Sequence, residues 1–281
     1  MSDTWDSSQE PDPVHLGPAG WLRFTGRALM LIVLVFGGLL LLLALRLIER
    51  PLFGLKRPMT PFVTQAVCRC AFVLMGMGFE ARGEIMRHPG AVVANHGSWL
   101  DIFTLNAKKR IYFVSKSEVA KWPGIGWLAR ATGTVFIERN PAKAREQTVL
   151  FEQRLLAGHK LLFFPEGTST DGLRVLPFKT TLFAAFFSEH LAPVAYIQPV
   201  SVCYVAPKDA PARFYGWWGD MEFAEHLIKT LGARRQGRVV IAYHSPLKVS
   251  EFSSRKALAR AAEDAVRAGH SALAAELDVP L

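Results

Sequence analysis

Cysteine is scarce in this sequence of 281 residues, which contains only Cys68, Cys70 and Cys203. An odd number of cysteines at scattered positions is not the pattern of a disulfide-bonded framework. Cys68 and Cys70 lie in an apolar run without a second pair, and none of the eight histidines stands in an H-E-x-x-H or other metal-binding spacing. The sequence therefore predicts reduced thiols, no metal site and a protein on the cytoplasmic side.

The motifs of several common enzyme classes are also missing. No serine stands in the G-x-S-x-G elbow of the α/β-hydrolases, and no Walker sequence for binding nucleotide phosphates occurs. Gly124 and Gly126 follow Pro123 rather than a strand, and they lack the third glycine of a dinucleotide fingerprint. These absences argue against a serine hydrolase, a P-loop nucleotide-binding protein and a dinucleotide-dependent enzyme.

Positive charge is in excess, with a net charge of +9 and an isoelectric point of about 9.7. Such a balance indicates either an acidic partner or a basic surface that only aids solubility. No helix or loop is crowded with lysine and arginine, and no zinc-finger spacing is present, so no nucleic acid partner is expected. Anionic lipid and an acidic carrier protein both fit the charge.

The first part of the chain contains a long apolar run. Residues 1–20 are polar, acidic and rich in serine and proline, which predicts disorder, and they lack the basic start of a secretory signal peptide. Between Arg27 and Arg46 follow 18 residues without a charge. As a helix this run would rise about 27 Å, close to the bilayer core of about 30 Å.

A second apolar segment runs from about residue 61 to residue 79, and Pro51 and Pro58 separate the two segments. Basic residues flank both ends of the first segment, so the positive-inside rule gives little preference for its orientation. Residues 21–80 are therefore predicted to be membrane-associated helices, either as one span or as a hairpin that enters one leaflet. A buried core helix is the third alternative for the first segment.

Residues 81–281 show a different pattern, in which short β-branched and aromatic runs alternate with helical stretches. This alternation predicts an α/β domain with a mostly parallel central sheet flanked by helices, and the nearly continuous apolar strands agree with burial of both sheet faces. Residues 207–236 interrupt the alternation and are interpreted as an insertion. Strands are expected at 91–94, 111–116, 134–139, 160–166, 194–205 and 238–244, and helices near 99–107, 118–131, 141–157 and 177–190.

Polar clusters follow three of the predicted strands, where open α/β sheets bind their ligands. The first cluster is Asn95-His96-Gly97-Ser98-Trp99-Leu100-Asp101. If a helix starts near Ser98, the Asp101 carboxylate can hold one ring nitrogen of His96 and leave the other nitrogen as a base. A histidine that only forms a structural hydrogen bond at a strand end fits the residues equally well.

The second cluster is Phe164-Pro165-Glu166-Gly167-Thr168-Ser169. Pro165 cannot continue a central strand, Gly167 permits a tight turn, and Glu166 needs a partner so close to an apolar strand. The third cluster, residues 136–140, contains Arg139, whose guanidinium suits an anion. An ordinary polar turn and a surface salt bridge are the alternatives for these two clusters.

The three clusters, in this order, resemble the motifs of the glycerolipid acyltransferases, in particular the bacterial lysophosphatidate acyltransferases. The similarity covers roughly residues 75–205 and includes the stretch Lys116–Gly126 between the first two motifs. The matching positions are Asn95, His96 and Asp101 for N-H-x4-D, residues 133–139 for G-x-x-F-I-x-R, residues 164–168 for F-P-E-G-T, and residues 197–200 for an apolar-Pro-apolar strand.

The resemblance implies a membrane-bound acyltransferase. His96 would remove the proton from a lysolipid hydroxyl as that oxygen attacks an acyl thioester, and Asp101 would orient the imidazole. Amides near Gly97 or Gly167 are expected to hold the oxyanion. The implied donor is an acyl thioester of acyl-carrier protein or CoA, and no cofactor is expected. The implied location is the bacterial inner membrane, with the catalytic domain facing the cytoplasm. The residues expected to contact substrate are Asn95, Lys116, Arg139, Glu166, Gly167 and Thr168.

One position departs from the family pattern. The family has an arginine after the threonine of its third motif, which helps to hold the acceptor's phosphate, whereas this sequence has Ser169. Arg139, Lys116 or Lys179 would have to replace it, or the acceptor carries no phosphomonoester. The TSTDG and WWGDMEF stretches resemble a branch that acylates lyso-ornithine lipid through a hydroxyl on its fatty chain.

Three functions therefore follow from the sequence, in a definite order. Acylation of 1-acyl-glycerol-3-phosphate to phosphatidate ranks slightly ahead, and O-acylation of lyso-ornithine lipid is next. A non-catalytic lipid-binding membrane protein is the alternative from another class.

Overall fold

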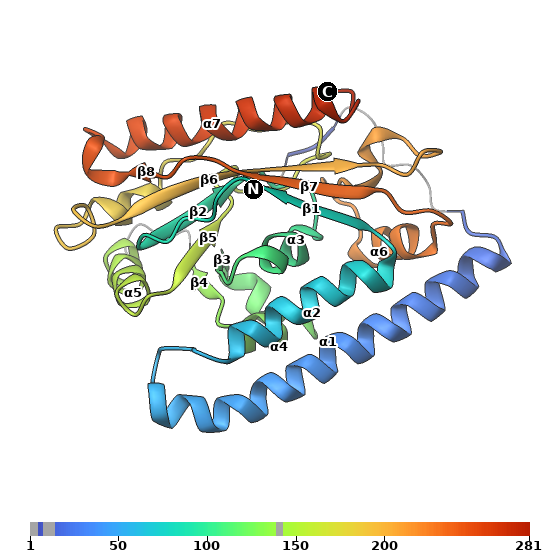
Figure 1. Ribbon diagram of the computed structural model, residues 1–281, viewed down its shortest axis with the longest axis horizontal. Coiled ribbons are helices and arrows are strands. Elements are labelled where there is room, and N and C mark those ends of the chain that lie inside the picture. The colour runs from blue at the N-terminus through green and yellow to red at the C-terminus, as the bar shows by residue number, and fades with distance from the viewer. Residues whose placement is uncertain (1–4, 8–14, 139–142) are drawn as a thin grey trace.

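The computed structural model of the chain describes residues 5–7, 15–138 and 143–281. In these residues eight strands form one sheet in the order β1-β7-β6-β2-β5-β3-β4, and β8 pairs with the start of β6 (Figure 1). The strands are β1 (Gly78–Arg82), β2 (Gly90–Ala94), β3 (Tyr112–Lys116), β4 (Val135–Ile137), β5 (Lys160–Phe163), β6 (Tyr196–Val205), β7 (Arg238–Tyr243) and β8 (Leu247–Lys248).

The sheet is mostly parallel, as predicted. Strands β2 to β6 all run in one direction, whereas β7 and β8 are antiparallel to β6, and β1 runs with β7. Strand β1 was not expected, because Glu80 and Arg82 break its apolar pattern. The boundary predicted at residue 80 therefore falls inside a strand of the sheet.

Helices cover both faces of the sheet, which confirms the predicted α/β class. Along β2, Val92 and Ala94 pack in the core beneath α1, α2, α3 and α6, while Ala91 and Val93 pack in the core with α5 and α7 (Figure 1). The helices are α1 (Pro18–Phe53), α2 (Thr60–Met75), α3 (Asp101–Lys108), α4 (Ile125–Thr132), α5 (Ala144–Leu156), α6 (Phe223–Gly232) and α7 (Arg255–Glu276).

Two expected helices differ from the prediction. The segment 177–190 contains only the short 3₁₀ helix Leu182–Phe187, because its run of alanine and phenylalanine is apolar without helical periodicity. The segment 118–131 is split at Pro123-Gly124 into the 3₁₀ helix Ser117–Lys121 and α4. Gly124 has a φ of 71°, which favours glycine and turns the chain between the two pieces.

Helix α1 is twice as long as the charge-free run suggested. It has 36 residues, which correspond to about 54 Å. Its most apolar 18-residue window has a mean hydropathy of 3.0, and only 11% of that window is buried, so α1 is long and apolar enough to cross a membrane. Burial this low does not fit the alternative of a core helix.

Both ends of α1 are tied to the rest of the protein. Near its start, the Arg23 and Arg27 guanidinium groups donate to the carbonyl oxygens of Leu231, Gly232 and Ala233 at the end of α6, at 2.6–3.0 Å. Arginine at these carbonyls suits the negative end of the α6 dipole. The predicted insertion, residues 207–236, is therefore the anchor of α1 and not a peripheral addition.

At the other end of α1, the buried Glu49 carboxylate holds the start of α2. It accepts hydrogen bonds from the Met59 and Thr60 amides and the Thr60 hydroxyl, and Arg46 completes the set. The two helices then run antiparallel (Figure 1). At Gly38 a Cβ atom would lie 2.4 Å from the Val67 side chain, so glycine allows the close approach.

Helix α1 begins at Pro18, so the last three residues of the segment 1–20, which was expected to be disordered, are helical. Of the remaining residues, 1–4 and 8–14 lie outside the described residues. Residues 5–7 are described, and Trp5 contacts the domain through Thr168 and Gly219.

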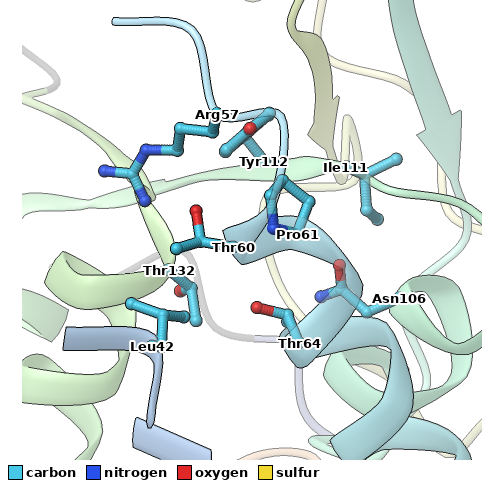
Figure 2. A pocket seen from close by; sticks show the side chains of 9 residues that line it. All are labelled: Leu42, Arg57, Thr60, Pro61, Thr64, Asn106, Ile111, Tyr112 and Thr132. Atoms are coloured by element: carbon cyan, nitrogen blue, oxygen red, sulfur yellow. The ribbon is translucent and has the colours of Figure 1, made fainter. Parts of the chain in front are cut away.

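A small cavity lies between the α1–α2 hairpin and the sheet (Figure 2). Its volume of about 10 Å³ gives room for about one water molecule. The side chains of Arg57, Thr60 and Asn106 are among those that line it, and none of the residues expected to bind substrate does so. The cavity therefore belongs to the packing of the hairpin.

The Glu49 network generates a stability prediction. We expect Glu49→Ala to lower the free energy of unfolding by about 2 kcal/mol, because the α2 amides lose a buried charged acceptor. Chemical unfolding in detergent micelles, followed by circular dichroism, measures the change. Glu80→Ala is the control, since Glu80 pairs with Arg82 at a half-exposed site and should change stability by less than about 1 kcal/mol. Equal losses in the two variants would contradict the prediction.

Candidate active site

The candidate site lies at the carboxyl edge of the sheet, where β2 and its neighbours β5 and β6 end. The loop after β2 carries His96 and leads into α3, which begins at Asp101. The loop after β5 carries Glu166 and Thr168. The amide of Thr170 donates to the His96 carbonyl at 2.9 Å, so the two loops are in direct contact.

His96 and Asp101 form the contact that the spacing predicted. The distance from His96 Nδ1 to Asp101 Oδ2 is 2.7 Å. Since a carboxylate only accepts, Nδ1 carries the proton and Nε2 presents a lone pair. No described residue hydrogen-bonds Nε2, and the His96 side chain is 21% exposed. The arrangement supplies an oriented base that a substrate can reach.

The Asp101 carboxylate is fully buried and has four donors. Oδ2 accepts from the amides of Gly97 and Ser98, each at 3.1 Å, as well as from His96. Oδ1 accepts from the Tyr204 hydroxyl at 2.6 Å. Burial, followed by the nearby Asp101 charge, raises the pKa of Tyr204 well above its ordinary value, so this hydroxyl keeps its proton and remains a donor.

The other face of the imidazole is also fixed. The His96 ring stacks on Phe164, with ring centroids 4.0 Å apart and planes inclined by 10°. At Gly97 a Cβ atom would come within 2.8 Å of the Gly172 Cα, so only glycine lets the two loops pack this closely. Hydrogen bonding and packing together leave the ring one orientation.

Glu166 lies deeper than a residue that contacts substrate through its carboxylate. It is 1% exposed, and its two oxygens accept from the amides of His96 and Leu176, both at 2.8 Å. Burial, followed by repulsion from Asp101, raises the pKa of Glu166 to about 8. This placement differs from the predicted role in binding and makes Glu166 a support for the His96 backbone.

Asn95 also faces the protein rather than a pocket. Its side-chain amide is buried and bonds both the carbonyl and the amide of Val202 on β6, at 2.9 and 2.8 Å. The neighbouring strand therefore takes both ends of its amide, and the expected substrate contact of Asn95 stays a prediction. Asn95 fixes the end of β2 against β6.

The expected oxyanion donors are already engaged. The Gly97 amide donates to Asp101, and the Gly167 amide donates to the Phe164 carbonyl at 3.1 Å. Gly167 has a φ of 74° and forms the tight turn that the sequence predicted. The Thr168 hydroxyl accepts from the Trp5 amide at 3.2 Å, at the half-buried rim of the site.

The structure describes only one of the two cations predicted to contact substrate, Lys116 and Arg139. Lys116 is exposed at the carboxyl end of β3, next to β5 on the same edge of the sheet. Arg139 lies outside the described residues. Among the described residues no group of three His, Cys, Asp or Glu side chains is placed to hold a metal ion.

Several residues of the site were missed by the sequence analysis. Tyr204 is a strand residue with no motif around it, and it reaches Asp101 from 103 positions away. The Trp217 amide donates to the Gly97 carbonyl at 2.9 Å, so the predicted insertion forms a wall of the site. In the same region Trp99 Nε1 donates to His226 Nδ1 at 2.9 Å, which ties the insertion to the loop before α3.

Comparison with known proteins identifies the family of the chain. The family profile described as Acyltransferase matches residues 79–203. A lyso-ornithine lipid O-acyltransferase from Rhodobacter capsulatus is 57% identical over 267 residues, which cover 94% of this chain and 96% of the relative. A 1-acyl-sn-glycerol-3-phosphate acyltransferase from Neisseria gonorrhoeae is 37% identical over 121 residues, or 42% of this chain and 48% of the relative.

A solved structure has the same fold. The crystal structure of the 1-acyl-sn-glycerophosphate acyltransferase PlsC from Thermotoga maritima aligns with a TM-score of 0.62 and covers 90% of this chain and 95% of its own. The sequences are 22% identical, so this likeness concerns the fold alone.

The raised pKa of Glu166 generates a prediction about pH. Above its ordinary value of 4.5 the unfolded chain releases the Glu166 proton, while the folded protein keeps it up to about pH 8. The contribution of Glu166 to the free energy of unfolding is therefore fully present below pH 4.5, and it is lost as the pH rises to about 8. Between pH 5 and pH 8 we expect the wild-type Tm to fall relative to that of Glu166→Gln, measured by thermal unfolding in detergent. The exposed Glu225→Gln serves as control, and parallel curves for wild type and Glu166→Gln would contradict the prediction.

Proposed function

The chain belongs to the acyltransferase family, and from this premise we propose that it transfers a fatty acyl group from a thioester to the hydroxyl of lyso-ornithine lipid. The main observation that supports this reaction is the arrangement of His96. Its Nδ1 is held by Asp101, while its Nε2 stays open to a substrate. The choice of acceptor is supported by a relative that is named a lyso-ornithine lipid O-acyltransferase. The match covers 94% of this chain and 96% of the relative.

The chemistry proceeds by direct transfer. His96 Nε2 takes the proton of the lipid hydroxyl while that oxygen attacks the thioester carbonyl. The imidazolium that forms is stabilised by the Asp101 carboxylate. Collapse of the tetrahedral intermediate breaks the carbon–sulfur bond, and the leaving thiolate takes the proton back from His96. The products are the acylated lipid and a free thiol, and no enzyme nucleophile is needed.

The proposed donor is an acyl thioester of acyl-carrier protein or CoA. A thioester is already activated and the transfer is redox-neutral, so the scheme requires no cofactor. The net charge of +9 suits either an acidic carrier protein or the phosphates of CoA.

Two observations support lyso-ornithine lipid over lysophosphatidate as the acceptor, which reverses the order given by the motifs. The glycerophosphate relative matches less than half of this chain, whereas the lyso-ornithine lipid relative matches 94% of it. In addition, Ser169 stands where the glycerophosphate pattern has the arginine that holds a phosphate.

We further propose that α1 and α2 form a hairpin that enters one leaflet of the bacterial inner membrane from the cytoplasmic side. Arg23 and Arg27 bind the carbonyls at the end of α6 near one end of α1. Just beyond the other end, Arg57 donates to the Ala131 carbonyl in α4 at 2.8 Å. A helix that crossed the bilayer would have to place these two ends on opposite sides of the membrane. Exposed apolar side chains such as Leu29, Val33 and Leu40 supply the inserted surface.

The mechanism predicts the effect of removing the base. We expect His96→Ala to lower kcat at least about 100-fold with circular dichroism unchanged, because Nε2 of His96 is the proposed acceptor of the hydroxyl proton. The assay measures thiol release from acyl-CoA and acyl-carrier protein in the presence of lysolipid. His190→Ala is the control, since its side chain is 71% exposed outside the site. Turnover by His96→Ala within tenfold of wild type would refute the role.

The membrane proposal predicts a loss of binding. Leu29→Glu/Val33→Glu places two charges on one exposed face of α1, and we expect at least a tenfold weaker association with liposomes of anionic phospholipid. Flotation on a density gradient measures the bound fraction. Leu156→Glu, at an equally exposed leucine of α5, should bind as the wild type does. A hairpin variant that floats like the wild type would rule out insertion of this face.

A further inference from the structure

The segment 170–174 contacts the backbone of the loop that carries His96, and it also contains a charged pair. Thr170 donates its amide to the His96 carbonyl at 2.9 Å, and Gly172 lies against Gly97. The same segment contains Asp171 and Arg174, whose side chains form an ion pair with an Nη2–Oδ2 distance of 2.8 Å. The pair is therefore within a few residues of the contacts that hold His96.

The two partners differ in burial. The Asp171 side chain is 5% exposed and accepts from both Nε and Nη2 of Arg174 and from the Leu173 amide. The Arg174 side chain is 51% exposed, and its Nη1 donates to no described residue. Asp171 thus holds the guanidinium of Arg174 in place, and Nη1 of the half-exposed Arg174 remains available as a donor.

Trp5 covers this guanidinium and joins it to the third motif. Arg174 Cζ lies 5.0 Å from the Trp5 ring centroid, and the Trp5 amide donates to the Thr168 hydroxyl. The Trp5 ring also contacts Trp218, whose Nε1 is a buried donor without an acceptor among the described residues. An oxygen ligand at this rim would find a donor in the Arg174 guanidinium, which Trp5 links to Thr168.

We propose that Arg174, held by Asp171 and Trp5, binds the carboxylate of the acceptor's headgroup and so selects an amino-acid lipid over a phosphomonoester. The inference rests on the proposed function and names the residue that takes the place of the arginine missing at Ser169. A guanidinium binds a carboxylate with directed, charge-assisted hydrogen bonds.

The charge balance of the pair explains the selectivity. An ornithine whose α-amino group is acylated carries one carboxylate and one ammonium group, so its headgroup has no net charge. Arg174 and Asp171 together also have no net charge, and they offer directed donors without an excess of positive potential. A phosphomonoester carries more than one negative charge near pH 7, and it would require an unpaired cation at this position.

The test compares acceptors that differ in the carboxylate alone. Full-length protein in mixed micelles is assayed with N-(3-hydroxyacyl)ornithine, with its carboxyl methyl ester and with lysophosphatidate, using one acyl thioester. We expect wild type to prefer the free acid over the ester by about 10- to 100-fold in kcat/KM, the range for a charged hydrogen bond. In Arg174→Met this ratio should fall close to one.

Two further variants make the result decisive. Arg174→Met leaves the buried Asp171 without its partner, so Arg174→Met/Asp171→Asn removes both charges and must lose the same discrimination. Arg82→Met breaks an exposed ion pair with Glu276 far from the site and should keep the wild-type ratio.

The outcomes separate the two proposals. If both Arg174 variants fold and keep the wild-type preference for the free acid, or if wild type has no such preference, the role of Arg174 is overturned and the acyl transfer stands. If wild type acylates lysophosphatidate alone, the proposed acceptor fails and the role of Arg174 fails with it. If wild type acylates no lysolipid, the proposed function itself is wrong.

Discussion

The site depends on the hydrogen bonds that surround the buried carboxylate of Asp101. A charge in this position is unfavourable unless donors surround both oxygens. Here the donors come from the loop after β2, from the His96 ring and from Tyr204 on the neighbouring β6. Because the loop must fold back to satisfy the carboxylate, its conformation and the tautomer of His96 are set together. The geometry of the proposed catalytic pair is thus a consequence of solvating one anion with the protein's own groups.

A second buried carboxyl group links this loop to its neighbour. Glu166 bonds the amide of His96 from the loop after β5, and its proximity to Asp101 contributes to its raised pKa. A further set of contacts continues outward, from Gly97 to Trp217 in the segment before α6, and from the end of α6 to Arg27 on α1. The apolar hairpin and the base are therefore joined through one continuous set of hydrogen bonds and packed elements.

The sequence predicts what is local and misses what depends on neighbouring strands. The strand, loop and helix that carry His96 and Asp101 are contiguous, so their spacing alone indicates that the two side chains meet. Tyr204 is indistinguishable from a core residue of β6, because only the folded sheet brings it to Asp101. Asn95 and Glu166 show a related limit, since a motif reveals a polar residue at a strand end but not whether it faces substrate or backbone.

The position of the site relative to the bilayer follows from the energetics of the acceptor. Moving an acyl chain of about 16 carbons from lipid into water costs about 12 kcal/mol, at about 0.8 kcal/mol for each methylene. The hydrogen bonds that Arg174 donates to the headgroup cannot supply that free energy, since each charge-assisted hydrogen bond contributes about 2 kcal/mol. An enzyme with these side chains must therefore meet the lipid while its chain remains in the membrane. A hairpin fixed to the catalytic domain by Arg23 near the start of α1, and by Arg57 at the Ala131 carbonyl just beyond its end, meets this requirement. It holds the partly exposed His96 at a constant depth relative to the inserted apolar surface.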